Sequence, residues 1–229
     1  MTETNVIPGI EFLAHEADLL IAEVLSAGGR ACVTSSFQAE CMVLVHLVTR
    51  RAPEIPVLFL DTGYHFQETY AYRDATSASM GLQLVNLVPK QTVAQQEAEF
   101  GELYRSAPDQ CCGRRKVEPL FGAVGQFDVW FTALRREQSP TRANLKADDD
   151  FALPGGKHVR KVSPLAAWTA KDVWSYMKRH EIPALPLYER GFSSIGCEPC
   201  TALPFDPDNP RSGRWGGQKV ECGIHIASK

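Results

Sequence analysis

The 229-residue sequence lacks the features that would place it in a membrane, in a secretory route or on nucleic acid. No stretch approaches the roughly 20 apolar residues that a membrane span requires. Residues 1–8 include an acid and no basic region followed by an apolar run, so we expect no secretory signal. The net charge of −3, from 24 Lys and Arg against 27 Asp and Glu, gives no basic field for nucleic acid. We therefore expect a cytoplasmic protein without a membrane or nucleic-acid partner.

Internal repeats and low-complexity segments are also absent. Hydrophobic residues make up 44% of the chain and are spread along it, which fits a globular domain with a real core. After Ile182 the sequence is rich in Pro and Gly and is no longer periodic. We predict one domain over residues 1–205 and a mobile C-terminal segment over residues 206–229. The oligomeric state stays open, a homo-oligomer included.

Hydrophobic periodicity predicts strands that alternate with helices. Apolar residues at helical spacing from Ile10 to Val24 predict a first helix that ends near Gly28. Further helices are expected at 39–48, 91–100, up to 124 and at 168–180, and strands at 31–33, 57–60, 82–87, 129–132 and 161–165. Three successive aspartates and Pro-Gly-Gly predict an exposed loop over 144–157. The alternation indicates a single-domain α/β fold with a mostly parallel sheet flanked by helices.

Seven cysteines are an odd count, and in a reducing compartment this argues against a disulfide framework. The tandem Cys111-Cys112 and the later Cys197-Glu-Pro-Cys200 could together hold zinc or an iron-sulfur cluster. Zinc ligand pairs normally leave two to four residues between cysteines, which tandem cysteines do not fit well. A 4Fe-4S cluster, which offers a separate iron to each thiolate, is favoured, with zinc, redox dithiols and buried thiols as alternatives. Cys32 and Cys41 lie in apolar runs and are expected in the core.

Basic residues follow the tandem cysteines directly and recur in two later clusters. The first run ends at Lys116, and the others are Arg135-Arg136 and the pair Arg211 and Arg214. Cationic side chains would offset the charge of an anionic cluster and of a phosphate or sulfate substrate. A solvated basic surface is the alternative for any one arginine, and only the position beside the cysteines singles out Lys116.

Two turns follow predicted strands. Hydroxyls and backbone N–H groups of the turn 34–36, at the start of a helix, suit a phosphate, although a plain N-cap is an equal interpretation. The turn lacks G-x-x-x-x-G-K-[ST], so it is not a Walker A loop. The second turn, Asp61-Thr62-Gly63, comes after a strand that is expected to be buried on both faces. Open α/β sheets bind ligands at such carboxyl ends.

The last candidate is Cys222 in Glu-Cys-Gly-Ile-His225. A cysteine near a chain end, preceded by several glycines, could move between a substrate and a protein reductant. Lys219 and His225 are cations that would lower the pKa of its thiol. A free surface thiol is the alternative.

Together these motifs resemble the assimilatory adenylyl-sulfate reductases of bacteria, relatives of phosphoadenylyl-sulfate reductase in the adenine nucleotide α-hydrolase-like group. The resemblance runs from about Ser35 to His225. Its motifs are Leu60-Asp-Thr-Gly63 with Glu68-Thr-Tyr70, the run from Cys111 to Lys116, the run from Arg135 to Arg142, Ser194 to Cys200, Arg211 to Trp215 and Glu221 to His225.

The resemblance implies a role for each motif. A 4Fe-4S cluster would bind Cys111, Cys112, Cys197 and Cys200, with Cys222 as nucleophile and His225 beside it. Ser35, Ser36 and Phe37, with Asp61, Thr62 and Gly63, would hold the nucleotide, Lys116 would lie between cluster and substrate, and Arg135 or Arg136 with Arg211 and Arg214 would bind phosphate and sulfate. Related ATP pyrophosphatases have Ser-Gly-Gly at the turn where this chain has Thr-Ser-Ser. This difference argues against cleavage of ATP.

The function expected from this resemblance is reduction of adenosine 5′-phosphosulfate to sulfite and AMP, in sulfate assimilation toward cysteine. Cys222 would carry an S-sulfocysteine intermediate, and thioredoxin or glutaredoxin would supply the electrons. The first alternative is the 3′-phosphorylated substrate, whose dedicated reductases usually lack the four cluster cysteines. A zinc-stapled nucleotide-binding module without reductase activity is the second.

Overall fold

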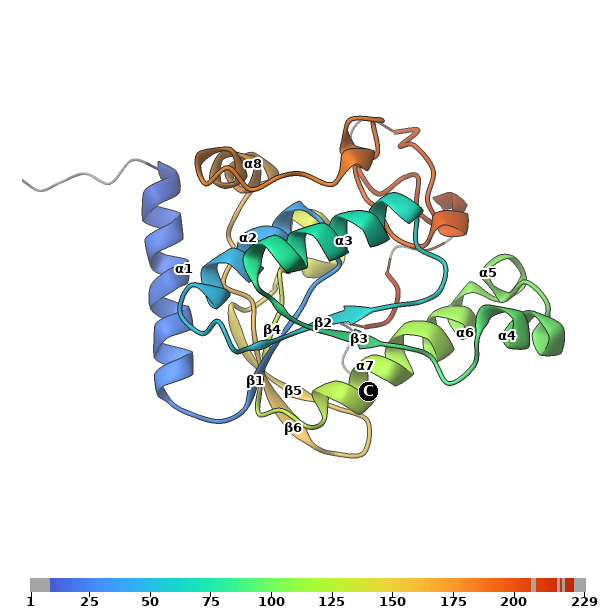
Figure 1. Cartoon of the computed structure of the whole chain (residues 1–229), viewed down its shortest axis with the longest axis horizontal. Coiled ribbons are helices and arrows are strands. Elements are labelled where there is room, and N and C mark those ends of the chain that lie inside the picture. The colour runs from blue at the N-terminus through green and yellow to red at the C-terminus, as the bar shows by residue number, and fades with distance from the viewer. Residues whose placement is uncertain (1–8, 207–208, 218, 220, 225–229) are drawn as a thin grey trace, which may run out of the picture.

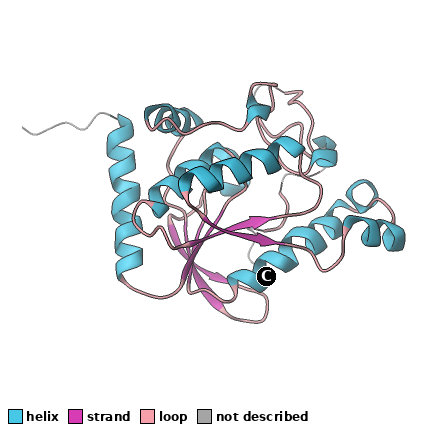
Figure 2. Ribbon diagram, in the orientation of Figure 1, coloured by secondary structure: helices cyan, strands magenta, loops and turns pink. Residues whose placement is uncertain are grey.

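A six-stranded sheet forms the centre of the molecule in the computed structural model, which describes residues 9–206, 209–217, 219 and 221–224 (Figures 1 and 2). The strands are β1 (Ala31–Thr34), β2 (Pro56–Leu60), β3 (Gln83–Leu87), β4 (Val129–Phe131), β5 (Asp148–Ala152) and β6 (His158–Val162), in the order β3-β2-β1-β4-β6-β5. All neighbouring pairs are parallel except β5 with β6. The chain moves outward from β1 to β3 and resumes on the other side of β1, so the strand order reverses between β1 and β4. The predicted α/β class is confirmed.

Helices cover both faces of the sheet because its strands are apolar on both sides. Within β1, Val33 belongs to the core cluster of one face and Cys32 to that of the other. The first face packs against α1 (Gly9–Ser26), α2 (Ala39–Thr49), α3 (Gln67–Met80) and α8 (Ala170–Arg179), and α7 (Glu118–Val124) covers the second face (Figure 1). The remaining helices are α4 (Val93–Phe100), α5 (Leu103–Ser106), α6 (Pro108–Cys112) and a π-helical turn at Gly113–Val117. No helix in the described ranges is long and apolar enough to cross a membrane.

The predicted loop over 144–157 is wrong, because it contains the edge strand β5. Two of its aspartates have partners on β6: Asp148 accepts two hydrogen bonds from Arg160 Nε, at 3.1 Å each, and His158 Nδ1 lies 2.5 Å from Asp150 Oδ2. Phe151 turns inward and is 5% exposed. Pairing therefore extends the last parallel strand backward, to 158–162 instead of 161–165. An edge strand with outward charges is also protected against pairing with another chain.

Residues after the predicted boundary at 205 fold back onto the domain. The Ala202 N–H donates to the Gly213 carbonyl at 2.8 Å, and a Cβ on Gly213 would lie 2.1 Å from the Ala202 oxygen. Only glycine therefore permits this contact. Ile224 is 8% exposed and joins the core cluster of the second face. That this segment moves stays a prediction.

The predicted helix at 168–180 is α8, and Thr169 is its N-cap, as expected. Asp172 N–H donates to Thr169 Oγ1 at 3.2 Å, and the Asp172 carboxylate accepts the Thr169 N–H at 2.8 Å. The Thr169→Ala substitution should lower the free energy of unfolding by about 1 kcal/mol, because alanine lacks the hydroxyl that accepts the Asp172 N–H and donates to the Asp172 carboxylate at 2.7 Å. Urea unfolding would measure the change, with the exposed Lys171→Ala on the same helix as control. Equal stabilities of the two variants would contradict the assigned cap.

Candidate active site

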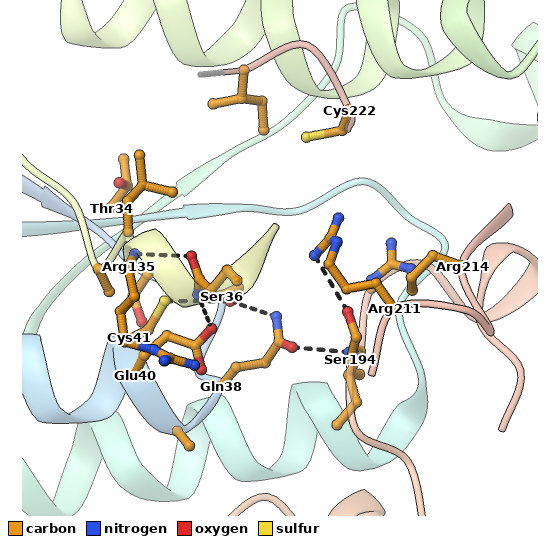
Figure 3. A pocket seen from close by; sticks show the side chains of 18 of the residues that line it. Thr34, Ser36, Gln38, Glu40, Cys41, Arg135, Ser194, Arg211, Arg214 and Cys222 are labelled. Carbon is orange, nitrogen blue, oxygen red and sulfur yellow. Dashed lines mark hydrogen bonds between the residues drawn. The ribbon is translucent and has the colours of Figure 1, made fainter. Parts of the chain in front are cut away.

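A cavity of about 730 Å³ opens where the strand order reverses, at the carboxyl ends of β1, β2 and β4. Its volume suits a nucleotide-sized ligand, and open α/β sheets bind ligands at this place. The loops after β1 and β4 form one side, the segments 192–196 and 210–215 form the other, and residues 221–224 approach from a third direction (Figure 3). Eight of the residues singled out from the sequence line it: Ser35, Ser36, Thr62, Lys116, Arg135, Arg211, Arg214 and Cys222.

The turn after β1 presents its two serines to the cavity while its phenylalanine enters the core. Ser35 Oγ accepts the Phe37 N–H at 3.1 Å, and Ser36 Oγ accepts a hydrogen bond from Gln38 Nε2 at 2.9 Å. Phe37 has φ +58°, is fully buried and does not line the cavity. The structure therefore does not support its predicted role in holding the nucleotide. The N-cap of α2 is Gln38 and makes no side-chain cap bond, so the plain N-cap interpretation of the serines is wrong.

The arginines after β4 differ in direction. Arg135 is buried and donates from Nη1 to Glu137 at 2.8 Å and to the Trp168 carbonyl at 3.2 Å, while its buried Nε has no hydrogen-bond partner among the described residues. Arg136 is exposed, donates to the Leu145 carbonyl at 2.9 Å and does not line the cavity. Of the two candidates at this position, the structure therefore brings only Arg135 to the site.

Arg211 and Arg214 form the cationic wall opposite the turn after β1 (Figure 3). Arg211 Nη1 donates to Ser194 Oγ at 3.4 Å. Arg214 lies over the Trp215 ring at 4.5 Å, is 5% exposed, and its buried Nε has no hydrogen-bond partner among the described residues. Burial lowers the pKa of both guanidinium groups, and in Arg214 the charge of Arg211 adds to this effect. An anion between them would offset the desolvation of both guanidinium groups and the repulsion between them.

The cavity wall carries more positive than negative side chains. Lys116, Arg135, Arg142, Arg211 and Arg214 are the five cations, and Glu40, Glu137 and Glu221 are the three acids. Two of the acids are paired with wall arginines, Glu137 with Arg135 and Glu221 with Arg142. Lys116 and Arg214 have no ion-pair partner in the described part of the chain. The surplus of positive charge suits an anionic ligand.

The four cysteines predicted to bind a cluster meet in a second, smaller cavity. Cys111 and Cys112 end α6, where the helix widens into the π-helical turn, and they line this cavity with Cys197 and Cys200. Thr62 Oγ1 lies 3.2 Å from the Cys197 Sγ and so connects the end of β2 to the cysteine pair. π-Helical turns occur often at functional sites.

Burial governs the charge of these thiols. It raises the pKa of Cys111 and Cys112, and it raises the pKa of Cys200 to about 11, with the neighbouring Cys197 adding to the effect. The thiols of Cys111, Cys112 and Cys200 are therefore protonated at neutral pH unless cations compensate for burial. Within the described ranges no three His, Cys, Asp or Glu side chains are placed to hold one metal ion. Four thiols around one cavity do fit a group with several metal atoms, one for each thiolate.

Lys116 lines both cavities. Burial lowers the pKa of its ammonium group, but the negative charges that Cys197 and Cys222 carry as thiolates raise it, so the net pKa lies above the ordinary value. Lys116 is therefore cationic at neutral pH and lies between the four cysteines and the larger cavity.

Asp61 and Gly63 position the turn after β2 and do not line the larger cavity. Asp61 Oδ1 accepts hydrogen bonds from Tyr70 Oη at 2.7 Å and from the Gly63 N–H at 3.1 Å. Gly63 has φ +74°, and a Cβ there would lie 2.8 Å from Val93 Cγ2. Asp61 and Gly63 therefore shape the turn, while their neighbour Thr62 lines the cavity.

Cys222 approaches the cavity from the side opposite Gln38 and Ser194 (Figure 3). Lys219, expected beside the thiol, instead pairs with Asp109, and His225 lies outside the described residues. Cys41, expected in the core, packs against it but also lines the cavity, where its Sγ lies 3.4 Å from Ser36 Oγ.

Sequence reasoning missed several cavity residues, of which Arg142 matters most. Arg142 binds the carboxylate of Glu221, next to Cys222. Arg142 could have been noticed in the sequence because it ends the motif that begins at Arg135. That motif does not show which of its arginines faces which partner.

Comparison with known proteins assigns the chain to a family. The model of the phosphoadenosine phosphosulfate reductase domain matches residues 30–203. The chain belongs to this family. It is 44% identical over 203 residues to a Streptomyces coelicolor protein named adenosine 5′-phosphosulfate reductase, which covers 86% of this chain and 83% of the relative. A Geobacillus thermodenitrificans protein of the same name is 41% identical over 215 residues, covering 91% and 89%.

Solved structures of lower sequence identity share the fold. A phosphoadenylyl-sulfate reductase from Candida auris, solved as a phosphate complex, superposes with a TM-score of 0.71 at 20% identity, over 88% of this chain and 98% of that one. The NH3-dependent NAD synthetase from Campylobacter jejuni superposes with a TM-score of 0.55 at 9% identity, over 82% and 80%. At these identities the likeness shows the fold alone.

The contact between Gly196 and Arg214 gives a test of the cationic wall. A Cβ at residue 196 would lie 2.1 Å from Arg214 Nη2, so the Gly196→Ala substitution should push this flexible side chain aside without unfolding the protein. We expect affinity for inorganic phosphate or sulfate to fall by about tenfold, the effect of losing one hydrogen bond to a charged group. Calorimetric titration would measure it. The exposed Gly122→Ala in α7 is the control, and unchanged affinity in Gly196→Ala would remove Arg214 from the anion site.

Proposed function

We propose that this protein reduces adenosine 5′-phosphosulfate to sulfite and AMP, with thioredoxin or glutaredoxin as reductant, in sulfate assimilation toward cysteine. The observation that carries the proposal is that Cys222 lines one cavity with the hydroxyls of the turn after β1 and the cations Lys116, Arg211 and Arg214. A nucleophilic sulfur and an anion site in one cavity are what attack on the sulfur of a phosphosulfate anhydride needs. The names of the curated relatives support the same substrate.

In the first step the Cys222 thiolate attacks the sulfur of the phosphosulfate. The bond from that sulfur to the bridging oxygen breaks, AMP leaves with the electron pair, and the enzyme carries S-sulfocysteine. Repulsion between a thiolate and a sulfate opposes this approach. Lys116, Arg211 and Arg214 reduce that repulsion and stabilise the negative charge that develops on the leaving phosphate. Ser35 and Ser36, which line the same cavity, would bind the phosphate group.

In the second step a thiolate of the reductant attacks the Cys222 sulfur and releases sulfite. The resulting mixed disulfide is resolved by the reductant's second thiol, which restores the Cys222 thiol and leaves the reductant as a disulfide. The dithiol loses two electrons, and the transferred sulfur gains them. This cycle requires that Cys222 be presented first to the substrate and then to another protein.

For the four-cysteine cavity we propose a 4Fe-4S cluster held by Cys111, Cys112, Cys197 and Cys200. When bound, the cluster would supply a positive metal site for each thiolate and an electrostatic field beside Lys116. The chain's own contribution is to tie both pairs to the end of β2, because Thr62 Oγ1 contacts Cys197 and the Thr62 carbonyl accepts a hydrogen bond from Arg115, which follows the tandem cysteines. The substrate chemistry above needs no electron from the cluster.

The decisive activity test uses Cys222. Incubation of the wild type with substrate but without reductant should add one sulfonate to Cys222, detected by peptide mass spectrometry, and Cys222→Ser should neither form the adduct nor release sulfite. Cys32→Ser, at a cysteine buried in β1 that does not line the cavity, is a thiol control and should retain the adduct. Sulfite release by Cys222→Ser at the wild-type rate would refute the mechanism. Parallel assays with the 3′-phosphorylated substrate decide between the two reductase functions.

The proposed cluster has a direct spectroscopic test. Protein purified without oxygen should be brown and absorb broadly near 400 nm, whereas a zinc protein is colourless because Zn²⁺ is d¹⁰. Cys197→Ala should lose most of the iron and this absorbance, while Cys222→Ala should retain both, since Cys222 lines only the larger cavity. A colourless wild type with one zinc per chain would favour the zinc-stapled alternative.

A further inference from the structure

The carboxylate of Glu221, directly before Cys222, is held by a single loop. Its Oε1 accepts hydrogen bonds from Ser139 Oγ at 3.0 Å, Thr141 Oγ1 at 3.2 Å and Arg142 Nε at 3.0 Å. Its Oε2 accepts a further bond from Arg142 Nη2 at 2.7 Å. The arginine thus binds both carboxylate oxygens, an arrangement that is stronger and more directional than a single contact.

This ion pair is shielded from solvent. The side chains of Arg142 and Glu221 are 13% and 11% exposed, so salt screens them less than the ion pairs of the surface. Burial raises the pKa of Glu221, but Arg142 outweighs this effect and holds the net pKa below its ordinary value. The carboxylate therefore stays ionised, and the contact stays charged, at neutral pH.

The pair restricts where Cys222 can lie. Consecutive Cα atoms are about 3.8 Å apart, so fixing Glu221 fixes the approach of the chain to Cys222 from one side. From the other side Ile224 is anchored in the core cluster that contains Trp130 and Phe151. The Glu221–Arg142 ion pair therefore holds the chain before Cys222, and the packing of Ile224 holds it after Cys222. The Cys222 side chain lies at the cavity.

We propose that Glu221 and Arg142 form a latch that positions Cys222 for attack on the substrate and whose opening exposes Cys222 to the reductant. Glu221 and Arg142 are positioning residues in this inference, which rests on the function proposed above. The loop that carries Arg142 begins at Arg135, so the same loop contributes to the anion site and holds the nucleophile.

The first measurement does not depend on the proposed function. The rate at which iodoacetamide modifies Cys222, followed on its peptide by mass spectrometry, should rise by about tenfold in Glu221→Gln and in Arg142→Gln, because each loses charged hydrogen bonds. The double variant should match the single variants, since the two residues act through one contact. The control is Asp148→Asn, which breaks an equivalent pair with Arg160 outside the cavity and should leave the rate unchanged.

The second measurement separates positioning from substrate binding. In single turnovers without reductant, Glu221→Gln should form the Cys222 adduct at least tenfold more slowly than the wild type, with the dissociation constant of AMP unchanged. Sulfite release from preformed adduct by thioredoxin should be as fast as in the wild type or faster. Glu221→Asp, which keeps the charge, should restore part of the lost rate of adduct formation.

Three results would overturn the latch. Unchanged alkylation of Cys222 in all three variants would show that the pair does not restrain it. A loss of AMP affinity in Glu221→Gln parallel to the loss of adduct formation would show that Glu221 supports substrate binding and not the position of Cys222. Slower sulfite release from the preformed adduct would show a general defect. If instead the wild type formed no adduct, the proposed function would fail, while the alkylation rates would still decide whether the latch exists.

Discussion

The buried guanidinium of Arg115 fixes the position of the cysteine-bearing helix relative to the sheet. It donates to the Thr62 carbonyl at 2.6 Å, to the Gln91 carbonyl at 3.3 Å and to Gln96 Oε1 at 3.1 Å. These acceptors lie after β2 and at the start of α4, while Arg115 itself lies in the π-helical turn that follows the tandem cysteines. Because Lys116 is the next residue, the same contacts hold its ammonium group between the two cavities. The positions of the cysteine pair and of Lys116 therefore depend on one buried cation, whose hydrogen-bond acceptors all belong to the protein.

The parallel part of the fold could be predicted from the sequence because its signals are local. Buried strands such as β2 are continuous apolar runs between turns, and the cap at Thr169 carries its own partner three residues later. The edge strand β5 could not be predicted in this way. Its aspartates are typical of a loop, and only Arg160 and His158 on the paired strand make their placement in a sheet favourable. That information lies in the pairing, which local sequence does not contain.

The site could be predicted as a set of motifs but not as a geometry. The cysteines, Lys116 and Cys222, which the motifs named, line two cavities that share Lys116. They did not separate Arg135, which faces the cavity, from Arg136, which faces solvent, because a short 3₁₀ turn has no periodicity to indicate direction. Phe37 shows a second limit: its left-handed backbone sends the ring into the core while the serines before it stay at the cavity.

Where Cys222 is held, its supports are side chains and not strands. In the described part of the C-terminal segment, Lys219 pairs with Asp109, Glu221 with Arg142, and Ile224 packs in the core. Contacts of this kind can open one at a time without breaking the sheet, because none of them belongs to its ladder of backbone hydrogen bonds. Under the proposed function, Cys222 would react first with a small anion and then with a protein, and such an attachment would permit both. A strand would hold the thiol too firmly for the second partner, and an unattached end would not oppose the repulsion between a thiolate and a sulfate.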